Sequence, residues 1–468
     1  MMDDDRLLPA EPGVRAIARR LLERTRRLPI VSPHGHLDPH QFASDAPLGN
    51  PAEVLVTSDH YLLRMLYSQG VPLESLGVVP ADGSAAETDG RTIWRTFAEH
   101  YSLFRATPSR LWLDHTLGEV FGIDQRLSAA TADDIYDRML EALGSDAFRP
   151  RALYDRFGIE MLATTDSAVS SLSDHAVIAA SDWSGVVVPT FRPDGVVDPD
   201  RGDFIDNLGR LSEMTGADTG TWRGYLEALR IRRREFIELG ATATDHGHPE
   251  VTTVDLGEKE ADSLFGRVVS GAGSAADHEL FRAKMLVEMA AMSVDDGLVM
   301  QLHAGSQRNH NDSLGRRFGP DIGADIPSAM EYVRSLKALL DRFGNETRLT
   351  IVVYTLDEST YSRELAPLAG HYPSLKLGPP WWFHDSPEGM RRFRESVTET
   401  AGFANTVGFN DDARSLLAIP GRHDVARRID AGFLAGLVAE HRLDEDEACE
   451  VAEDLAVGLA RRTFVRQP

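Results

Sequence analysis

Short apolar runs of strand length recur along the chain, and longer segments with the apolar spacing of helices separate them. Eight such runs occur, at residues 28–32, 160–164, 186–191, 241–244, 298–302, 349–354, 375–377 and 405–409. Near-continuous apolar strands that alternate with helices are typical of a parallel sheet buried on both faces. Eight units of this kind predict an α/β fold, a (β/α)8 TIM-like barrel.

A long connection separates the first two predicted strands, and it carries helix signals of its own. Asp59 precedes an apolar pattern of helical spacing that ends at Gly70, and Thr131 precedes another that ends at Gly144. We therefore expect three parts: residues 1–44 with the N-terminal segment and the first barrel strand, residues 45–150 as a helical insertion that caps the barrel mouth, and residues 151–468 as the remainder of the barrel with C-terminal helices.

Composition places the chain among globular proteins and limits its partners. Hydrophobic residues make up 42% and charged residues 26% of the 468 positions. No apolar run approaches the roughly 20 residues that span a bilayer, so we expect no membrane partner. The formal net charge of −24 disfavours nucleic acid, because phosphate contacts need clustered lysines and arginines. An anionic small-molecule substrate would need local positive charge in its pocket.

The N-terminus and the cysteine content favour a cytoplasmic protein. The chain begins Met-Met-Asp-Asp-Asp-Arg, without the basic start and apolar core of a signal peptide. Cys449 is the single cysteine, which permits no internal disulfide and fits a reducing compartment. Neither feature indicates how many subunits assemble, so a homo-oligomer remains one of the alternatives.

Polar side chains directly follow most of the predicted strands. The clusters are His34 and His36, Thr165-Asp166, Arg192-Pro193-Asp194, Asp245-His246-Gly247, His303-Ala304-Gly305, Trp381-Trp382 and Asp411-Asp412-Ala413-Arg414. The catalytic groups of such barrels come from the C-terminal ends of several strands. We therefore expect these residues to meet at one mouth of the barrel.

Three of these residues form a candidate metal site. His34 and His36 are two residues apart and would project from the same face of an extended strand end. Asp412 follows the last predicted strand, which neighbours the first in a closed barrel. Two imidazoles and a carboxylate suit Zn²⁺ or a similar divalent ion, whereas the plain alternative is strand-end residues bonded to nearby backbone. His303 is either a further ligand or an acid/base group.

A second group of candidates is basic. Arg192, Arg308 and Arg414 all follow predicted strands closely. Guanidinium grips a carboxylate through two parallel hydrogen bonds, so these arginines would suit an acidic substrate. Each could instead pair with a nearby carboxylate of the chain, as Arg192 could with Asp194.

Two pairs of neighbouring residues leave alternatives open. Asp245 and His246 are either a proton-handling pair or a strand-end cap. Trp381 and Trp382 either form an apolar wall against a sugar ring or pack in the core.

A third group lies in the predicted insertion, where Arg64 follows His60 and Tyr61 after one helical turn. If this trio faces the barrel mouth, Tyr61 supplies a phenol as acid or base, with nearby positive charge to lower its pKa. A buried helix would need only Tyr61 from this set, for packing.

A series of motifs carries a resemblance to a known family. In chain order these are His34-Gly35-His36-Leu37-Asp38-Pro39, Asp59-His60-Tyr61, Thr164-Thr165-Asp166, Arg192-Pro193-Asp194, Asp245-His246-Gly247, Gln301-Leu302-His303 with Arg308-Asn309, Trp381-Trp382-Phe383, and Asp412-Ala413-Arg414-Ser415 with Arg422-His423. With them the chain resembles the uronate isomerases, the glucuronate isomerase branch of the amidohydrolase superfamily, over residues 28–430. The tryptophan pair and the Asp-x-Arg-Ser element are specific to that branch.

The resemblance implies aldose–ketose isomerisation, of D-glucuronate to D-fructuronate and of D-galacturonate to D-tagaturonate. It implies that Tyr61 and Arg414 handle the C2 proton, and that Asp245 and His303 stabilise or recycle charge. The implied site is catalytic through Tyr61, Asp245, His303, Asp412 and Arg414, binds the hexuronate through His60, Arg192, Arg308, Trp381 and Trp382, and holds a divalent metal, Zn²⁺ first, through His34, His36 and Asp412. The chain departs from the family pattern at Pro379-Pro380, which bears on the loop and on sugar preference.

Elementary chemistry agrees with this implication. Removal of the proton beside an aldehyde requires stabilised enediolate oxygens and a base within reach. Return of the proton to C1 needs no redox cofactor, and the chain has no Gly-x-Gly-x-x-Gly or phosphate loop, so we expect no nucleotide cofactor.

The chief alternative is a metal-dependent hydrolase or deaminase on the same barrel, in which Asp412 would activate a water. Such sites commonly add histidines after later strands, but the sixth strand here ends in Tyr354-Thr355-Leu356-Asp357. A non-catalytic sugar-binding protein is a third hypothesis. It would have no need for histidines, carboxylates and arginines gathered at one mouth.

Overall fold

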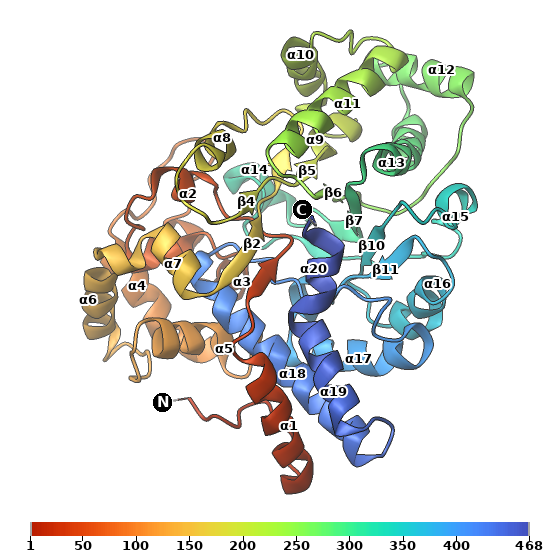
Figure 1. Ribbon diagram of the computed structural model, residues 1–468. Coiled ribbons are helices and arrows are strands. Elements are labelled where there is room, and N and C mark those ends of the chain that lie inside the picture. Colours follow the sequence, from red (N-terminus) through yellow and green to blue (C-terminus); the bar gives the residue numbers. More distant parts are fainter. Residues whose placement is uncertain (1, 467–468) are drawn as a thin grey trace.

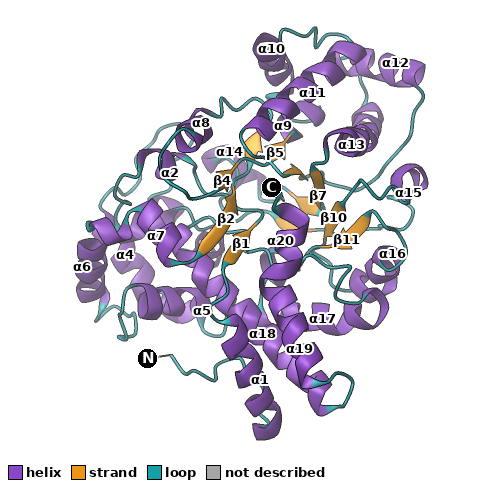
Figure 2. Cartoon of the chain, in the orientation of Figure 1, coloured by secondary structure: helices purple, strands orange, loops and turns teal. Residues whose placement is uncertain are grey.

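Parallel strands form the centre of the molecule, and helices surround them (Figures 1 and 2). The computed structural model describes residues 2–466. Its strands are β1 (Ile30–Ser32), β2 (Ile159–Ala163), β3 (Asp166–Ser167), β4 (Val187–Val188), β5 (Phe191–Arg192), β6 (Ala243–His246), β7 (Val299–His303), β8 (Ser306–Gln307), β9 (Ile326–Pro327), β10 (Ile351–Tyr354) and β11 (Leu375–Leu377).

The parallel strands are assigned to two sheets, and two continuous stretches of chain contribute a strand to each sheet. The strand orders of the two sheets are β1-β2-β4 and β11-β10-β7-β6-β5-β3. The path of residues 159–167 contains both β2 and β3, and the path of residues 187–192 contains both β4 and β5, so the two sheets continue into one another. Neighbours in space therefore follow chain order, and the predicted α/β barrel arrangement is confirmed.

The barrel does not close through a continuous ladder. Of the last predicted strand, 405–409, only Thr406 forms a parallel bridge, to Leu377 of β11. Ala413 accepts a hydrogen bond from the His36 backbone N–H at 2.8 Å, which links the segment after β1 to the segment before the last long helix. The first and last segments of the predicted barrel are thus neighbours.

Alternate strand residues divide between two environments, as the near-continuous apolar runs predict. Val31, Met161, Ala243, Val299 and Val352 belong to one buried cluster among the strands. Their neighbours along the strands pack in two other clusters beneath the helices: Ile30, Leu162, Met300, Ile351 and Val353.

Every regular element described between β1 and β2 is helical. The α-helices there are α2 (His40–Ser44), α3 (His60–Ser68), α4 (Gly90–Glu99), α5 (Pro108–His115), α6 (Ala132–Leu143) and α7 (Pro150–Arg156). The side chain of Asp59 caps α3 by accepting hydrogen bonds from the backbone N–H groups of Tyr61 and Leu62. The start of α3, with its two site candidates, is therefore fixed by the chain itself.

Helices outside that connection cover the strands and extend the molecule at one end. They are α1 (Pro12–Thr25), α8 (Ser173–Ala179), α9 (Asp194–Val197), α10 (Phe204–Thr215), α11 (Trp222–Glu238), α12 (Glu258–Val269), α13 (Ala275–Asp296), α14 (Asp312–Phe318), α15 (Lys337–Phe343), α16 (Ala366–Ala369), α17 (Pro387–Ala401), α18 (Ile419–Ala439), α19 (Glu445–Glu453) and α20 (Leu459–Phe464). Helix α1 packs on α18 and α19, so the N-terminal helix lies against helices from the C-terminal part of the chain (Figure 1). No helix within residues 2–466 is long and apolar enough to cross a membrane.

Two local predictions are wrong in detail. The predicted strand 241–244 begins and ends too early, because β6 runs to His246 and includes Asp245. His34 and His36 do not lie on a regular strand, since β1 ends at Ser32. The short antiparallel pair β8–β9 was not predicted.

Candidate active site and metal centre

Two histidines from the start of the chain meet an aspartate from near its end. The Nε2 atoms of His34 and His36 lie 3.4 Å and 3.2 Å from Asp412 Oδ1. His34 and Asp412 are buried, and His36 is half-buried. The predicted convergence of these three side chains is therefore present, although 376 residues separate His36 from Asp412 in the sequence.

The geometry of this trio fits a divalent cation better than hydrogen bonding. Asp412 Oδ1 is buried and makes no hydrogen bond, despite the two nearby nitrogens. Ligand atoms bound about 2.1 Å from one tetrahedral ion stand about 3.4 Å apart. The two nitrogen–oxygen distances, 3.4 Å and 3.2 Å, are close to that spacing. His34, His36 and Asp412 are therefore a candidate metal-binding group.

A second buried group adjoins the first. His303 Nδ1 lies 2.6 Å from Asp245 Oδ1, and the rings of His303 and His34 stack with their centroids 4.3 Å apart. An ionised carboxylate only accepts hydrogen bonds, so Nδ1 of His303 donates and Nε2 carries the lone pair. Nε2 has no partner. His34, Asp245 and His303 also form a candidate metal-binding group. With its lone pair on Nε2, His303 is suited both to bind a metal and to act as an acid/base group.

Charge in this second group is fixed by its neighbours. Burial alone would raise the pKa of Asp245, but Arg192 and His303 hold it well below its usual range. Arg192 Nη1 lies 3.2 Å from Asp245 Oδ2. Burial lowers the pKa of His303 to about 4. At neutral pH the site therefore holds an ionised Asp245 and a neutral His303.

The three predicted arginines line one cavity of about 650 Å³, and each also contacts an aspartate. The ion pairs are Arg192 Nε to Asp194 at 2.7 Å, Arg308 Nη1 to Asp325 at 2.7 Å and Arg414 Nη2 to Asp321 at 3.1 Å. The three arginines therefore gather at one cavity, as predicted, and each also pairs with a carboxylate of the chain, which was the alternative. Arg414 Nε is buried without a partner and is available to a ligand.

Tyr61 lies beside this cavity rather than on its wall. It lines a smaller cavity that Arg414 also lines. Its buried hydroxyl has no hydrogen-bond partner. The Arg422 guanidinium lies 5.5 Å from the centre of its ring. The expectation of a lowered pKa is wrong, because burial raises the pKa of Tyr61 by more than Arg422 lowers it. The group is a protonated hydroxyl at neutral pH.

His60 and Arg64 lie on the same side of α3 as a third, smaller cavity, which Arg414 and Trp382 line as well. Neither ring nitrogen of His60 has a hydrogen-bond partner. Arg64 lies over the ring of Phe383 at 4.7 Å. The trio predicted around Tyr61 therefore does face the region of the site.

The tryptophan pair forms part of the large cavity's wall. The rings of Trp381 and Trp382 stack with centroids 4.8 Å apart. Trp381 lies 4.7 Å from the His303 ring, and Arg308 lies 5.1 Å from the centre of the Trp382 ring. Both side chains are largely buried, and both line the cavity. They therefore pack in the core and also form part of the cavity wall, which were the two alternatives.

The structure does not bring Asp245 and His246 together as a proton-handling pair. Both belong to β6, and successive strand residues point to opposite faces. His246 Nε2 contacts the Thr244 hydroxyl at 3.0 Å instead. The partner of Asp245 is His303, on the neighbouring strand β7.

Several site residues were missed from the sequence. Asp321 and Asp325, the partners of Arg414 and Arg308, lie between α14 and β9, where no apolar periodicity marks a structural element. Asp385 pairs with Arg422 at 2.6 Å, both buried; only Arg422 carried a signal, through the family motif.

Backbone strain provides a signal that only the structure shows. Nine non-glycine residues within 2–466 have positive φ, and four of them surround the site: Asn309, Asp321, Trp382 and Asp412. Such strained conformations persist only where contacts with the surrounding structure hold the backbone in place, and they are concentrated at ligand sites.

Comparison of the chain with known proteins shows which family it belongs to. The family model described as glucuronate isomerase matches residues 6–464. The chain belongs to the glucuronate isomerase family. The family predicted from the motifs is therefore confirmed, as is an enzyme of the isomerase class, and the hydrolase or deaminase alternative is not favoured.

Relatives of this family match along their whole length. A uronate isomerase from Phenylobacterium zucineum is 60% identical over 460 residues, which are 98% of this chain and 96% of that protein. The solved glucuronate isomerase from Caulobacter crescentus is 55% identical with a TM-score of 0.98, over 100% of this chain and 98% of that one. The solved uronate isomerase from Thermotoga maritima is 27% identical with a TM-score of 0.92, over 99% of both chains.

Proposed function

We propose that this protein interconverts the aldose and ketose forms of hexuronates, D-glucuronate with D-fructuronate and D-galacturonate with D-tagaturonate. The observation that carries this proposal is a set of buried polar atoms without partners in four residues: His303 and Arg414 line the large cavity, Tyr61 lines the smaller cavity that Arg414 shares, and Asp412 contacts His34 and His36. These atoms are Tyr61 Oη, His303 Nε2, Asp412 Oδ1 and Arg414 Nε. Buried polar groups cost stability unless they are satisfied, so their retention supports a polar ligand that satisfies them.

The arginines and tryptophans support a sugar acid as that ligand. Arg192, Arg308 and Arg414 bring guanidinium groups to the cavity wall; each is paired with an aspartate, and Arg414 keeps a buried Nε without a partner. A guanidinium binds a carboxylate through paired hydrogen bonds, which suits the C6 carboxylate of a hexuronate. Trp381 and Trp382 offer an apolar wall to the sugar carbons.

The reaction moves two protons within the substrate, one from C2 to C1 and one from the C2 hydroxyl to the C1 oxygen. The C2 proton leaves, its bonding electrons form the C1–C2 double bond, and the C1 carbonyl oxygen becomes an enediolate oxygen. The proton then returns at C1. The C1 oxygen gains a proton and becomes a hydroxyl, while the C2 hydroxyl loses its proton as its oxygen becomes the ketone. No redox partner is consumed, and the requirement is a base near C2 together with donors to the two oxygens.

We assign proton handling at C2 to Tyr61 and Arg414. Tyr61 is protonated in the free protein, so its role as the base requires that it first release its proton, and the nearby Arg422 guanidinium would stabilise the resulting phenolate. Arg414 lines both the large cavity and the smaller one that contains Tyr61, so it connects the phenol to the substrate's position. His303 Nε2 accepts a hydrogen bond from a substrate hydroxyl while Asp245 holds the Nδ1 proton in place. Asp245 thereby fixes the orientation of His303 and balances charge that develops on it.

His34, His36 and Asp412 are the residues that would hold a divalent metal, which we propose to be Zn²⁺. When bound, such an ion supplies a Lewis acid that polarises a substrate oxygen. Asp412 completes that group and is the last of its members along the chain, next to Ala413 and Arg414. Because Asp412 and Arg414 are two residues apart, the same short segment carries a proposed metal ligand and the proposed proton-handling arginine.

We further propose three properties of the whole chain. Residues 45–150 act as a unit over the barrel mouth, since α3 brings His60 and Tyr61 to the site. The partner is a small hexuronate rather than nucleic acid, as the net charge of −24 supports. The single cysteine, Cys449, supports a cytoplasmic location.

The proposal is tested by incubating the purified protein with D-glucuronate, D-galacturonate and D-glucose and recording ketose signals by NMR. We expect ketose from at least one of the two uronates. D-Glucose is the matched control, because it lacks only the C6 carboxylate and should react far more slowly. Absence of ketose from both uronates would refute the proposed function.

A further inference from the structure

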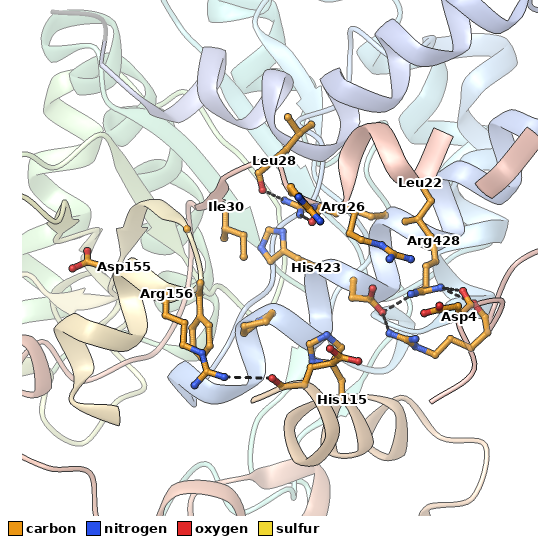
Figure 3. Close-up of a pocket in the computed structure, with 18 residues that line it drawn as sticks. Asp4, Leu22, Arg26, Leu28, Ile30, His115, Asp155, Arg156, His423 and Arg428 are labelled. Atoms are coloured by element: carbon orange, nitrogen blue, oxygen red, sulfur yellow. Dashed lines mark hydrogen bonds and ion pairs between the residues drawn. The ribbon is translucent and has the colours of Figure 1, made fainter. Parts of the chain in front are cut away.

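Another cavity, separate from the three already described, lies at the opposite end of β1 from the metal group. It has a volume of about 460 Å³ and is lined by residues from the start of β1, the N-terminal segment, α5, α7 and α18 (Figure 3). Leu28 and Ile30 reach it before β1 enters the barrel, whereas His34 follows the other end of that strand. The cavity is therefore separate from the proposed active site.

Positive charge is concentrated around this cavity. Six arginines line it: Arg6, Arg26, Arg27, Arg156, Arg427 and Arg428. Four carboxylates also line it, and three of these, Asp4, Glu119 and Asp155, are exposed to solvent. The fourth, Asp424, is already shared by Arg6 at 2.6 Å and Arg428 at 2.8 Å. In a chain with net charge −24 this local excess is unusual.

Arg427 is buried and, unlike Arg428, has no carboxylate partner among residues 2–466. Its side chain is 8% exposed. It donates hydrogen bonds to the carbonyl oxygens of Arg26, Leu28 and Pro29 at 2.8–3.1 Å, which hold its position but do not neutralise its charge. Its Nε has no partner. Burial lowers the pKa of Arg427 to about 10, against a smaller opposite effect of Asp424.

Three further groups on the wall are available. Arg26 and Arg27 are exposed, and their guanidinium groups make no ion pair with any residue that the structure describes. His115 is 91% buried, and its Nδ1 has no hydrogen-bond partner. Figure 3 shows His115, Arg26 and Arg156 around the same space, with Arg156 donating to the backbone carbonyl of Glu119.

We propose that this cavity binds a small organic anion with several oxyanion oxygens, carried on phosphate or on clustered carboxylates. One anionic group lies against Arg427 and His115, and Arg26 and Arg27 contact the remainder of the ligand at the rim. A volume of about 460 Å³ accommodates a molecule of metabolite size and exceeds what a single phosphate fills. Guanidinium groups bind both kinds of oxyanion through paired hydrogen bonds.

The test is calorimetric titration of the full-length protein at low ionic strength with inorganic phosphate and, separately, with tricarballylate. We expect at least one probe to bind with a dissociation constant below about 10 mM. The Arg26→Gln/Arg27→Gln double variant should bind that probe at least about tenfold more weakly. Both residues are exposed and unpaired, so the variant should keep the unfolding temperature of the wild type.

The control is Arg223→Gln, which removes an exposed charge on α11, outside the lining of the cavity. It should leave binding unchanged. Binding of phosphate alone identifies phosphate as the recognised group, and binding of tricarballylate alone identifies carboxylates. If neither probe binds the wild type, or if the double variant binds as tightly as the wild type, the proposed site is wrong.

Discussion

His303 Nδ1 lies 2.6 Å from Asp245 Oδ1, and this contact joins β7 to β6 where both strands reach the site. Both side chains are almost fully buried. Asp245 is also held by Arg192 at 3.2 Å, so it remains an ionised acceptor. The pair leaves His303 with one free nitrogen, Nε2, and so determines what the ring can offer to a substrate or a metal.

The first prediction concerns the tautomer of His303. The folded-state pKa is lowered to about 4, so the ring stays neutral as pH falls from 8 to 5, with the proton on Nδ1. Nitrogen-15 NMR of histidine-labelled protein measures this directly, and His303→Asn identifies the signal by its loss. Asp245→Asn should give a mixture of the two tautomers. A His303 ring that titrates near its ordinary pKa would contradict the assignment.

A second prediction separates catalysis from stability at Tyr61. Tyr61→Phe removes a buried hydroxyl that has no partner, so the unfolding temperature should stay the same or rise slightly. If the hydroxyl handles a proton, kcat should fall by at least about 100-fold.

Tyr101→Phe provides the opposite control. The Tyr101 hydroxyl donates to Asp114 at 2.9 Å, away from the site. Its removal should cost about 1 kcal/mol of unfolding free energy with kcat unchanged. Equal kcat values for Tyr61→Phe and the wild type would exclude the proposed role of Tyr61.

Metal content gives a third prediction. Elemental analysis of the purified wild type should find a divalent metal, and Asp412→Ala should lose most of it, because one of three ligands is gone. Asp262→Ala, at an exposed position on α12, is the matched control and should retain the metal of the wild type. Retention of full metal content by Asp412→Ala would remove this residue from the ligand set.

A fourth prediction tests the scaffold. Arg394 of α17 and Asp430 of α18 form a buried pair at 2.7 Å. Arg394→Met leaves the carboxylate unpaired and should lower the free energy of unfolding by about 3–5 kcal/mol, and Arg394→Met/Asp430→Leu should recover most of this loss. Arg391→Met, which breaks an exposed pair with Glu388, should cost less than about 1 kcal/mol. Urea unfolding measures all three.

The fold could be predicted because buried parallel strands have a simple signature. The runs at 298–302 and 349–354 lie within one or two residues of β7 and β10. The run at 405–409 is apolar as well, yet it forms only a bridge at Thr406, since pairing depends on partners that the local pattern does not contain.

Residues of the site could be predicted where chemically able side chains follow strand ends, and also on α3, where helical spacing groups His60, Tyr61 and Arg64. His34, His36 and Asp412 carried such a signal. The pairing of Asp245 with His303 rather than His246 depends on where β6 ends, and strand boundaries are the least certain part of a sequence pattern. Asp321 was missed because its segment shows no periodicity, and only the folded chain brings it to Arg414.

The most direct test of the whole account is ketose formation from D-glucuronate by Arg414→Ala, with metal content measured on the same sample. Arg414 is not a member of the metal group, so the variant should keep its metal and its fold. We predict that kcat/KM falls by at least about 100-fold, while Arg223→Ala, on the exposed face of α11, keeps wild-type activity. Near-normal turnover by Arg414→Ala would contradict the proposed mechanism at its centre.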